Sequence, residues 1–408
     1  LAGPLPDGDQ APADGLLSHD DIKGSEARTF HAYVHIPFCK DICGYCDFNT
    51  YTPSELKITE GLAQISNSYI DLLLMEIKAA KVQVGQSANV PSIFFGGGTP
   101  SLMQPDDIGR VISTIKSEFT LLPDAEITME CNPDTVTKES LAAFRAIGVN
   151  RVSFGMQSAV KHVLATLDRT HNPENLLQVT TWAKEVGFSE ISVDLIYGTP
   201  GESLADWQAS IDAALTLPIT HISAYALIIE EGTKLAAQIK RGDVAQVDDD
   251  LTAEKYLVAD KAFTAAGFEW YELSNWAKSG SLSKHNLAYW LGDNWWGAGP
   301  GAHSHLNGKR FWNVKHPNLY KERVLSNQSP VADSEILEEL QIESERLMLS
   351  LRLPSGVEKQ SLNEMQLSEL SSYVESGHLD LANWNQGRAT LTLDGRLIAD
   401  RILRQILL

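Results

Sequence analysis

Short β-rich segments alternate with amphipathic helical segments from residue 32 onward, and this alternation limits the fold more than any other feature of the sequence. Helices are indicated where apolar residues recur at positions i, i+3, i+4 and i+7. The clearest such set is Ile70, Leu73, Leu74 and Ile77. Further helices are predicted near 105–119, 138–147 and 251–266, and strands at 32–36, 92–95, 127–130, 151–155, 191–196 and 221–229.

Three of the predicted helices end at a glycine, namely Gly148, Gly187 and Gly267. A glycine after the last helical turn adopts the left-handed conformation that ends a helix, so each marks a corner before the next strand. Strict alternation predicts parallel strands joined by right-handed crossovers. Because six units are fewer than the eight of a closed barrel, we predict an α/β fold with an open, partial (β/α)6 TIM-like barrel.

Composition changes along the chain predict three parts. Residues 1–30 are rich in Pro, Gly, Asp and Ala and are expected to form a flexible tail. Residues 31–320 form the core domain, with an extension at 268–316 that is dense in Trp, Gly, Asn and His. Residues 321–408 are expected to form a smaller α+β domain of winged-helix-like shape. It is helical from about residue 331, has a β-like tail at 388–393, and serves as a structural cap or lid.

The charge of the chain excludes some classes of partner. There are 53 acidic residues against 33 basic ones, a formal net charge of −20, which argues against a general nucleic-acid binder. No apolar run reaches the roughly 18 residues of a membrane span, and we predict no transmembrane segment. The N-terminus lacks the basic flank and apolar core of a secretory signal, so we expect the reducing cytoplasm.

Three of the four cysteines, Cys39, Cys43 and Cys46, form a Cys-x3-Cys-x2-Cys motif directly after the first predicted strand. Thiolates are soft ligands that bind iron–sulfur clusters, zinc or copper(I). A disulfide framework and a zinc ion completed by His35 or Asp47 are the alternatives. A four-iron cluster is favoured, because three thiolates leave one iron without a protein ligand and no second cysteine pair exists to complete a zinc site.

Other polar and glycine residues also follow the ends of predicted strands, where barrel enzymes keep their active sites. The turn at 96–100, Gly-Gly-Gly-Thr-Pro, lacks side chains that would keep a ligand from backbone N–H and C=O groups. Glu130 ends the third strand and is placed to accept hydrogen bonds from a ribose diol; its alternative is an ordinary turn residue. These positions predict a ligand site beside the cysteines.

Two later strands add polar groups at the same edge. Gln157 and Arg169 follow the fourth strand, and a guanidinium suits a ligand carboxylate, although Arg169 could also be an ordinary surface base. Asp194 interrupts an apolar run, and an acid within a buried strand must be paired or bind a ligand. We therefore add Gln157, Arg169 and Asp194 to the predicted site.

The motifs together resemble those of a known superfamily. The cysteine motif followed by Gly-Gly-Gly-Thr-Pro is similar to that of radical S-adenosylmethionine (SAM) proteins, and Tyr33-x-His35-Ile36-Pro37-Phe38-Cys39 narrows the match. The segments at 153–158 and 194–201 extend it. The chain resembles the oxygen-independent coproporphyrinogen III oxidase family, which includes a heme-chaperone branch, HemW, from Tyr33 to Leu408.

The resemblance implies cofactors and roles for residues at matching positions. A [4Fe-4S] cluster would be bound by Cys39, Cys43 and Cys46, with its fourth iron chelated by the amino and carboxylate groups of S-adenosylmethionine. The other implied cofactor contacts are Gly97, Gly98 and Thr99 to the methionine part, Glu130 to the ribose, Gln157, Arg169 and Asp194 to further parts, and Tyr33 to the cluster. Electron transfer to the sulfonium would release methionine and a 5′-deoxyadenosyl radical.

Two departures point to the heme-chaperone branch rather than the oxidase. Phe48 stands where the resemblance to the oxidase calls for a further cysteine, and only about thirty residues precede Tyr33. The His-Asn-x-x-Tyr-Trp motif at 285–290 is associated in that branch with heme. His285 is the predicted heme ligand, with His303 and His305 as rivals, and the alternative for His285 is a hydrogen-bonded packing residue in an aromatic cluster. The expected apolar face for the porphyrin is formed by Tyr289, Trp290, Trp295 and Trp296.

The resemblance therefore implies a radical SAM heme chaperone that passes heme to membrane-bound heme proteins. The alternative is an oxidative decarboxylase that converts coproporphyrinogen III to protoporphyrinogen IX, and a weaker one is a radical SAM enzyme with an unrelated substrate. Whether the cofactor is cleaved or only bound, and whether the chain forms a homodimer, stay open at this point.

Overall fold

The computed structural model describes residues 8–10, 29–56, 62–84 and 88–407. Within them a mixed sheet has the strand order β1-β13-β12-β11-β10-β2-β3-β4-β5-β6-β7-β9-β8. Its central six strands are parallel neighbours. They are β2 (Phe30–Ile36), β3 (Asn89–Gly97), β4 (Thr120–Cys131), β5 (Arg151–Gln157), β6 (Glu190–Tyr197) and β7 (His221–Ala226). The predicted six-unit open barrel is confirmed.

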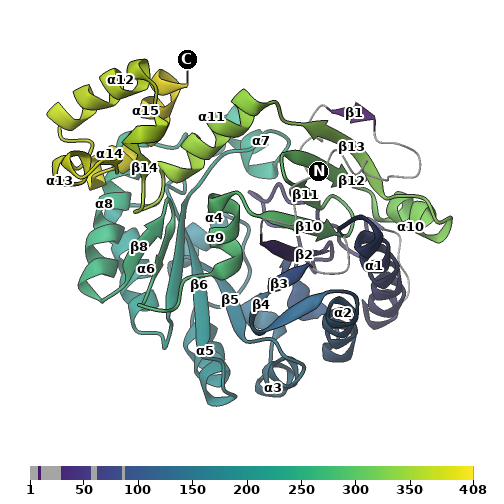
Figure 1. Cartoon of the computed structure of the whole chain (residues 1–408). Coiled ribbons are helices and arrows are strands. Elements are labelled where there is room, and N and C mark those ends of the chain that lie inside the picture. Colours follow the sequence, from purple (N-terminus) through teal and green to yellow (C-terminus); the bar gives the residue numbers. More distant parts are fainter. Residues whose placement is uncertain (1–7, 11–28, 57–61, 85–87, 408) are drawn as a thin grey trace.

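Helices follow each of these strands and cover the outside of the curved sheet (Figure 1). Gly148, Gly187 and Gly267 have φ values of 112°, 97° and 81°, as expected for left-handed residues that end helices. The outer helices are α1 (Leu62–Val84), α2 (Pro105–Glu118), α3 (Lys138–Ala146), α4 (Lys161–Thr166), α5 (Asn175–Glu185), α6 (Leu204–Leu215), α7 (Lys234–Arg241) and α8 (Asp249–Ala265).

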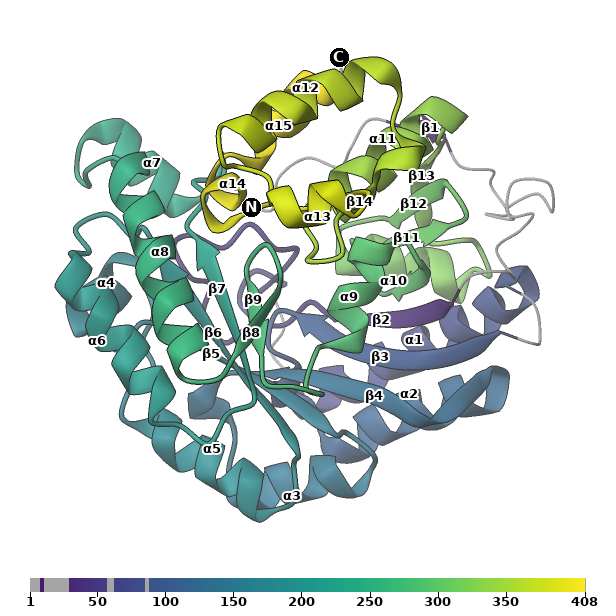
Figure 2. The ribbon, with the colours of Figure 1, turned by 60° about the vertical axis from the view of Figure 1, so that its left-hand side comes forward.

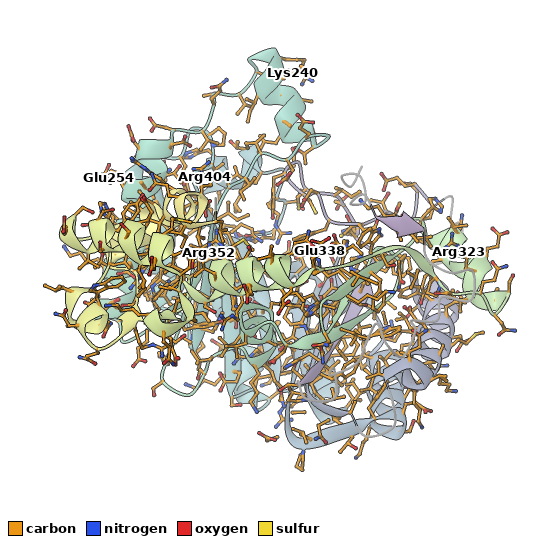
Figure 3. All side chains as sticks on the ribbon, turned by 45° about the horizontal axis from the view of Figure 1, so that its top comes forward. Lys240, Glu254, Arg323, Glu338, Arg352 and Arg404 are labelled. Carbon is orange, nitrogen blue, oxygen red and sulfur yellow. The ribbon has the colours of Figure 1, made fainter. Side chains whose placement is uncertain are left out.

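The main core lies between the sheet and these helices. Alternate residues of each strand point to the helix layer, which buries Val34 and Ile36 of β2 and Phe95 of β3 against apolar helix faces. The intervening residues point into the barrel and are largely polar, as Glu130, Ser153 and Asp194 show. The barrel interior is therefore lined by groups suited to a polar ligand. Figure 3 shows α7, with Lys240 at its tip, standing away from the rest of the molecule.

Further strands extend both edges of the barrel. The segment 268–316 supplies β8 (Glu269–Glu272) and β9 (Asn275–Ala277) beside β7, and β10 (Asn294–Ala298), β11 (His303–Leu306) and β12 (Lys309–Asn313) beside β2. Strand β9 is antiparallel to β7, whereas β10 is parallel to β2 and the strands beyond it are antiparallel. The helix α9 (Lys284–Leu291) lies between these two sets in the chain. The aromatic and histidine residues thus lie on α9 and on strands of the same sheet, and not in a separate unit.

Two expectations for the end of the chain need revision. Residues 331–336 were expected to be helical, but they form β13 (Val331–Ile336), since the exposed edge of β12 offers backbone partners to an extended segment. The expected domain boundary at 320 falls within α10 (Pro317–Leu325), which packs on α1. We propose that the division between the two units follows β13.

The C-terminal module, residues 338–407, has its own core, built around Leu347, Leu351 and Leu370. It contains α11 (Glu339–Ser350), β14 (Val357–Glu358), α12 (Glu364–Glu375), α13 (Leu381–Asn385), β15 (Arg388–Ala389), α14 (Leu393–Leu397) and α15 (Ala399–Ile406). The β-like tail predicted at 388–393 is reduced to β15, paired with β14, because the Thr392 side chain caps α14 and ends the extended segment.

This module lies beside the barrel (Figure 2), with α11 packed on α9 and Arg396 of α14 in contact with α8 and β8. The Arg396 guanidinium pairs with Asp260 of α8 at 2.9 Å and stacks on the Trp270 ring at 3.6 Å. At the other end of the chain, β1 (Asp9–Gln10) pairs with β13, while residues 1–7 and 11–28 of the expected tail lie outside the described part. No helix in the described residues is long and apolar enough to cross a membrane.

Candidate cofactor site at the strand ends

Two adjoining cavities open at the carboxyl ends of the parallel strands. The cysteine cavity, of about 220 Å³, is lined by all three motif cysteines, and the lumen cavity, of about 460 Å³, occupies the barrel interior. Glu130, Gln157 and Asp194 line both cavities. Of the residues predicted from the sequence, the cysteine cavity gathers Cys39, Cys43, Cys46, Gly97, Gly98, Thr99, Glu130, Gln157, Arg169 and Asp194.

The cysteine loop follows β2 and is fixed by backbone hydrogen bonds. The Cys39 N–H donates to the Tyr51 carbonyl at 3.1 Å, and the Cys46 N–H donates to the Cys43 carbonyl at 3.2 Å. Between them, the Gly44 N–H donates to the Leu167 carbonyl at 3.2 Å. All three cysteines are free thiols. The loop therefore presents three unpaired sulfur ligands from a defined backbone.

The donor set fits an iron–sulfur cluster better than a single metal ion. Among the described residues, no three His, Cys, Asp or Glu side chains are grouped to hold one ion. A cubic cluster makes a different demand, because each cysteine ligates a different iron. His35 was one of the two candidates for a fourth zinc ligand. Both of its ring nitrogens are hydrogen-bonded, one to Tyr33 Oη at 3.0 Å and the other to the Asn49 carbonyl at 2.8 Å. The zinc alternative thus loses one of its two proposed ligands.

Burial sets the protonation of these thiols. It raises the pKa of Cys39, although the Thr99 hydroxyl, 3.5 Å from the sulfur, opposes the shift. It also raises the pKa of Cys46 to about 12. The thiols of Cys39 and Cys46 are therefore protonated at neutral pH in the metal-free chain, and metal binding must release their protons.

The glycines of the 96–100 turn have a structural role that the sequence did not reveal. A side chain at Gly97 (φ 110°) would lie 2.5 Å from the His35 ring, and one at Gly98 would lie 2.5 Å from the Phe38 carbonyl oxygen. The Gly98 N–H donates to the Ile36 carbonyl at 2.8 Å, and the Thr99 N–H donates to Phe38 at 2.8 Å. The glycines thus allow the turn to pack directly on the start of the cysteine loop.

Two carboxyl groups stand in the wall shared by the cavities. The Glu130 carboxylate accepts a hydrogen bond from the Gly97 N–H at 3.1 Å, and burial, with the nearby Asp194, raises its pKa to about 8. Asp194 accepts from the Ser153 hydroxyl at 3.1 and 3.2 Å, and burial raises its pKa to about 6. Both carboxyls have free lone pairs facing a cavity, so both can accept hydrogen bonds from ligand hydroxyls.

Arg169 connects the cysteine loop to the end of β5. Its guanidinium donates to the Gly155 carbonyl at 2.8 Å and lies 3.5 Å from the Cys43 sulfur. A Cβ at Gly155 would lie 3.0 Å from both the Arg169 and the Gln157 side chains, so a larger residue here would press on both. Gln157 itself has a φ of 60°, at an irregularity between β5 and β6. This backbone conformation, uncommon for a side-chain-bearing residue, turns the strand end at the site.

Tyr33 and His285 line the lumen cavity but not the cysteine cavity. His285 is 1% exposed, and its ring nitrogens are hydrogen-bonded to the Ser92 hydroxyl at 2.7 Å and the Tyr289 hydroxyl at 2.9 Å. Its ring stacks on Phe94, with centroids 5.1 Å apart. Burial lowers its pKa well below the usual value. In this conformation both ring nitrogens already have partners.

The rival histidines differ in accessibility. The His305 ring is bonded to the Asp293 carbonyl at 3.1 Å and accepts from the Gly308 N–H at 2.9 Å. His303 is exposed, and its ring stacks on Trp312 with centroids 5.8 Å apart. Trp295, on the neighbouring strand β10, packs edge-on against Tyr289 at 4.8 Å. His303 therefore offers an accessible imidazole beside aromatic rings.

Three further residues around the cavities were not singled out as ligand contacts from the sequence. Tyr45 lies inside the cysteine motif and lines both cavities, so its position between Cys43 and Cys46 was an available signal. Phe48 also lines both cavities, with 62% of its surface exposed. His171 lines the cysteine cavity, and its only sequence signal is its distance of two residues from Arg169.

Comparison with known proteins agrees with this geometry. The model of the radical SAM superfamily matches residues 33–214. The chain is 42% identical to the heme chaperone HemW of Mycobacterium tuberculosis (strain H37Rv), over 93% of this chain and 95% of the relative. It is 33% identical to HemW of Bacillus subtilis (strain 168), over 91% and 97% of the two chains.

A solved structure shares the whole fold. The coproporphyrinogen III oxidase HemN of Escherichia coli, described as a radical SAM enzyme, superposes with a TM-score of 0.80 at 21% identity, over 97% of this chain and 96% of the other. At that identity the likeness concerns the fold. The sequence identities settle the family: the chain belongs to the radical SAM superfamily and, within it, to the HemW family.

Proposed function

We propose that the chain is a radical SAM heme chaperone that holds a [4Fe-4S] cluster and S-adenosylmethionine in the cysteine cavity. The observation that carries this proposal is the gathering of three free thiols and the predicted cofactor residues around one cavity. Cys39, Cys43 and Cys46 ligate the cluster. When bound, the cluster supplies an electron donor and an open iron for the amino-acid part of the ligand.

The side chains of the cavity supply binding and orientation. The Arg169 guanidinium faces the ligand carboxylate, since Arg presents a planar set of donors to such a group. Glu130 and Asp194 accept hydrogen bonds from ribose hydroxyls, and Gln157 adds an amide beside them. Because burial raises the pKa of Glu130 to about 8, hydroxyl donors compensate the desolvation of its ionised form. Thr99 and the backbone of Gly97 and Gly98 border the methionine part.

Heme is proposed as the cargo, in accord with the names of the relatives. The lumen cavity has an apolar rim on which a porphyrin can lie, and two of its residues are largely exposed, Phe48 at 62% and Ile228 at 70%. Membrane-bound heme proteins are the proposed recipients. With a net charge of −20, the chain is not proposed to bind nucleic acid. Its free cysteines suit a reducing compartment, for which we propose the cytoplasm.

The axial ligand is proposed to come from the histidines of this region. His285, predicted from its motif, becomes a ligand only when its bond to Tyr289 or Ser92 is broken. His303 needs no such rearrangement, because its ring is exposed. Visible spectra of heme-loaded wild type, His285→Ala and His303→Ala distinguish the two. The variant that lacks the ligand will lose or shift the Soret band, and the other will retain it.

The function is tested by incubating cluster-loaded protein without oxygen with heme and, separately, with coproporphyrinogen III and S-adenosylmethionine. The proposal expects stoichiometric heme binding and no catalytic formation of protoporphyrinogen. Repeated turnover of coproporphyrinogen would instead establish the decarboxylase. The absence of both heme binding and turnover would leave neither reading standing and favour a different substrate.

A further inference from the structure

His171 is the most unusual polar side chain of the cysteine cavity. It follows α4, is 5% exposed, and lines the cavity beside Arg169. Neither of its ring nitrogens has a hydrogen-bond partner with good geometry within the described residues, although the Met156 backbone lies close to the ring. Among the other buried histidines described, each has at least one bonded ring nitrogen, as in His285 and His221. A buried polar group without a partner is costly, and one facing a cavity is a position where a ligand can supply the missing bonds.

Arg169, two residues before His171, also has a buried nitrogen without a hydrogen-bond partner. Its terminal nitrogens reach Gly155 and Cys43, but its Nε is buried and has no partner in the described residues. The cavity wall thus holds three unpaired nitrogen atoms on two neighbouring side chains. A ligand that forms hydrogen bonds with all three nitrogen atoms must have several polar atoms close together.

The protonation state of His171 limits the ligand groups that can bind its ring. Burial, and then the positive charge of Arg169, lower its pKa to about 4, while Asp134 and the nearby Met156 carbonyl oppose the shift. At neutral pH the ring is uncharged, so it has one N–H donor and one acceptor nitrogen. An α-amino-acid head group matches this pair, because its carboxylate accepts a hydrogen bond and its amino group donates one.

We infer that His171 is a binding residue which, together with Arg169, recognises the amino-acid head group of the sulfonium ligand and favours ligands that retain the carboxylate. The inference rests on the proposed function, since it assumes that S-adenosylmethionine enters the cysteine cavity. It goes further by assigning His171, and by stating which part of the ligand His171 distinguishes.

The test compares two ligands in a binding cycle. Equilibrium dissociation constants are measured without oxygen on cluster-loaded protein for S-adenosylmethionine and for decarboxylated S-adenosylmethionine, which lacks only the carboxylate. His171→Ala is expected to weaken binding of the first at least about tenfold, because the hydrogen bond to the charged carboxylate is lost, and of the second clearly less, because only the bond from its amino group is lost. His162→Ala is the matched control, because His162 is exposed on α4 and lies outside both cavities.

A second variant protects the test against a folding defect. His171→Asn keeps a polar side chain but is shorter, and it is expected to show the same selective loss as His171→Ala. If either folded variant weakens both ligands equally, or neither, the inference is overturned while the proposed function stands. If wild type binds neither ligand, both are overturned. Selective loss in the folded variants, with none in His162→Ala, supports the inference.

Discussion

The cysteine cavity and the surroundings of His285 contain similar kinds of side chain in opposite states. Around His285 every ring nitrogen has a partner, and the ring stacks on Phe94. In the cysteine cavity, three thiols are free, and His171 and Arg169 keep unpaired nitrogens. The first arrangement is complete within the protein. The second leaves its hydrogen bonds to be completed by a ligand.

The two regions therefore have different roles: the first stabilises the fold, and the second binds a ligand. A satisfied buried network contributes to the free energy of unfolding, and removing one member leaves its partners unpaired. An unsatisfied cavity costs stability in the ligand-free chain and recovers it when the ligand binds. We therefore expect substitutions around His285 to act mainly on folding, and substitutions in the cysteine cavity to act mainly on cofactor binding.

The largest expected effect concerns the cluster. Cys46→Ala should lower bound iron and sulfide after anaerobic reconstitution to less than about a tenth of the wild-type content, because two thiolates no longer hold the cube. Iron and sulfide analysis, with the visible absorption of the cluster, measures this. Cys131→Ala is the control, since Cys131 lines the same cavity but lies outside the motif. Equal loss in both variants would contradict the assignment of the three motif cysteines.

The second prediction concerns the satisfied network. His285→Phe should lower the free energy of unfolding by about 2–4 kcal/mol, because the Ser92 hydroxyl and the Tyr289 hydroxyl lose a buried partner. His303→Phe should change it by less than about 0.5 kcal/mol, as expected of an exposed position. Denaturant unfolding of both variants measures the two values. Similar values would remove the distinction between the two histidines.

The third prediction is a loss of cofactor affinity without a loss of stability. Asp194→Asn should weaken S-adenosylmethionine binding about tenfold, since a charged acceptor for ligand hydroxyls is replaced by a neutral amide. Calorimetric titration measures the affinity, and thermal unfolding checks the fold. Asp212→Asn on the outer helix α6 is the control. Unchanged affinity in Asp194→Asn would place the ribose elsewhere.

The smallest expected effect is a pH dependence of the ligand-free chain. The pKa of Glu130 is raised from 4.5 to about 8, so between these values the folded chain binds more protons than the unfolded chain. The free energy of unfolding therefore falls as the pH rises through this window. Glu130→Gln should be more stable than wild type at pH 8 by about 1–2 kcal/mol and equal to it at pH 4. If the free energy of unfolding changed with pH equally in the two proteins, the pH dependence would not come from Glu130.

Much of the barrel was predictable because its signals are local. The helix-ending glycines and the apolar periodicity need no tertiary information, and the cysteine motif lies within eight residues. The strand β13 was missed because it depends on the free edge of β12, which the local pattern does not show. The tail at 388–393 was overestimated because the cap formed by Thr392 competes with extension.

Most residues of the site were predicted from the sequence, but the contacts between them were not. Glu130, Arg169 and Asp194 were selected as polar residues at strand ends, and parallel strands bring such ends together. The position of Tyr33 on the lumen side was not predicted, whereas the two bonded ring nitrogens of His285 agree with the alternative of a hydrogen-bonded packing residue. His171 follows a helix and not a strand, so a search of strand ends could not find it.

The cysteine cavity is assigned both the cluster and the ligand, so the two must be in contact when both are bound. Electron paramagnetic resonance of the reduced, cluster-loaded protein, recorded with and without S-adenosylmethionine, measures this contact. We predict that saturating ligand changes the signal of the cluster in wild type and that Asp194→Asn needs about tenfold more ligand for the same change. A cluster signal that the ligand leaves unchanged at millimolar concentration would contradict the assignment of this cavity.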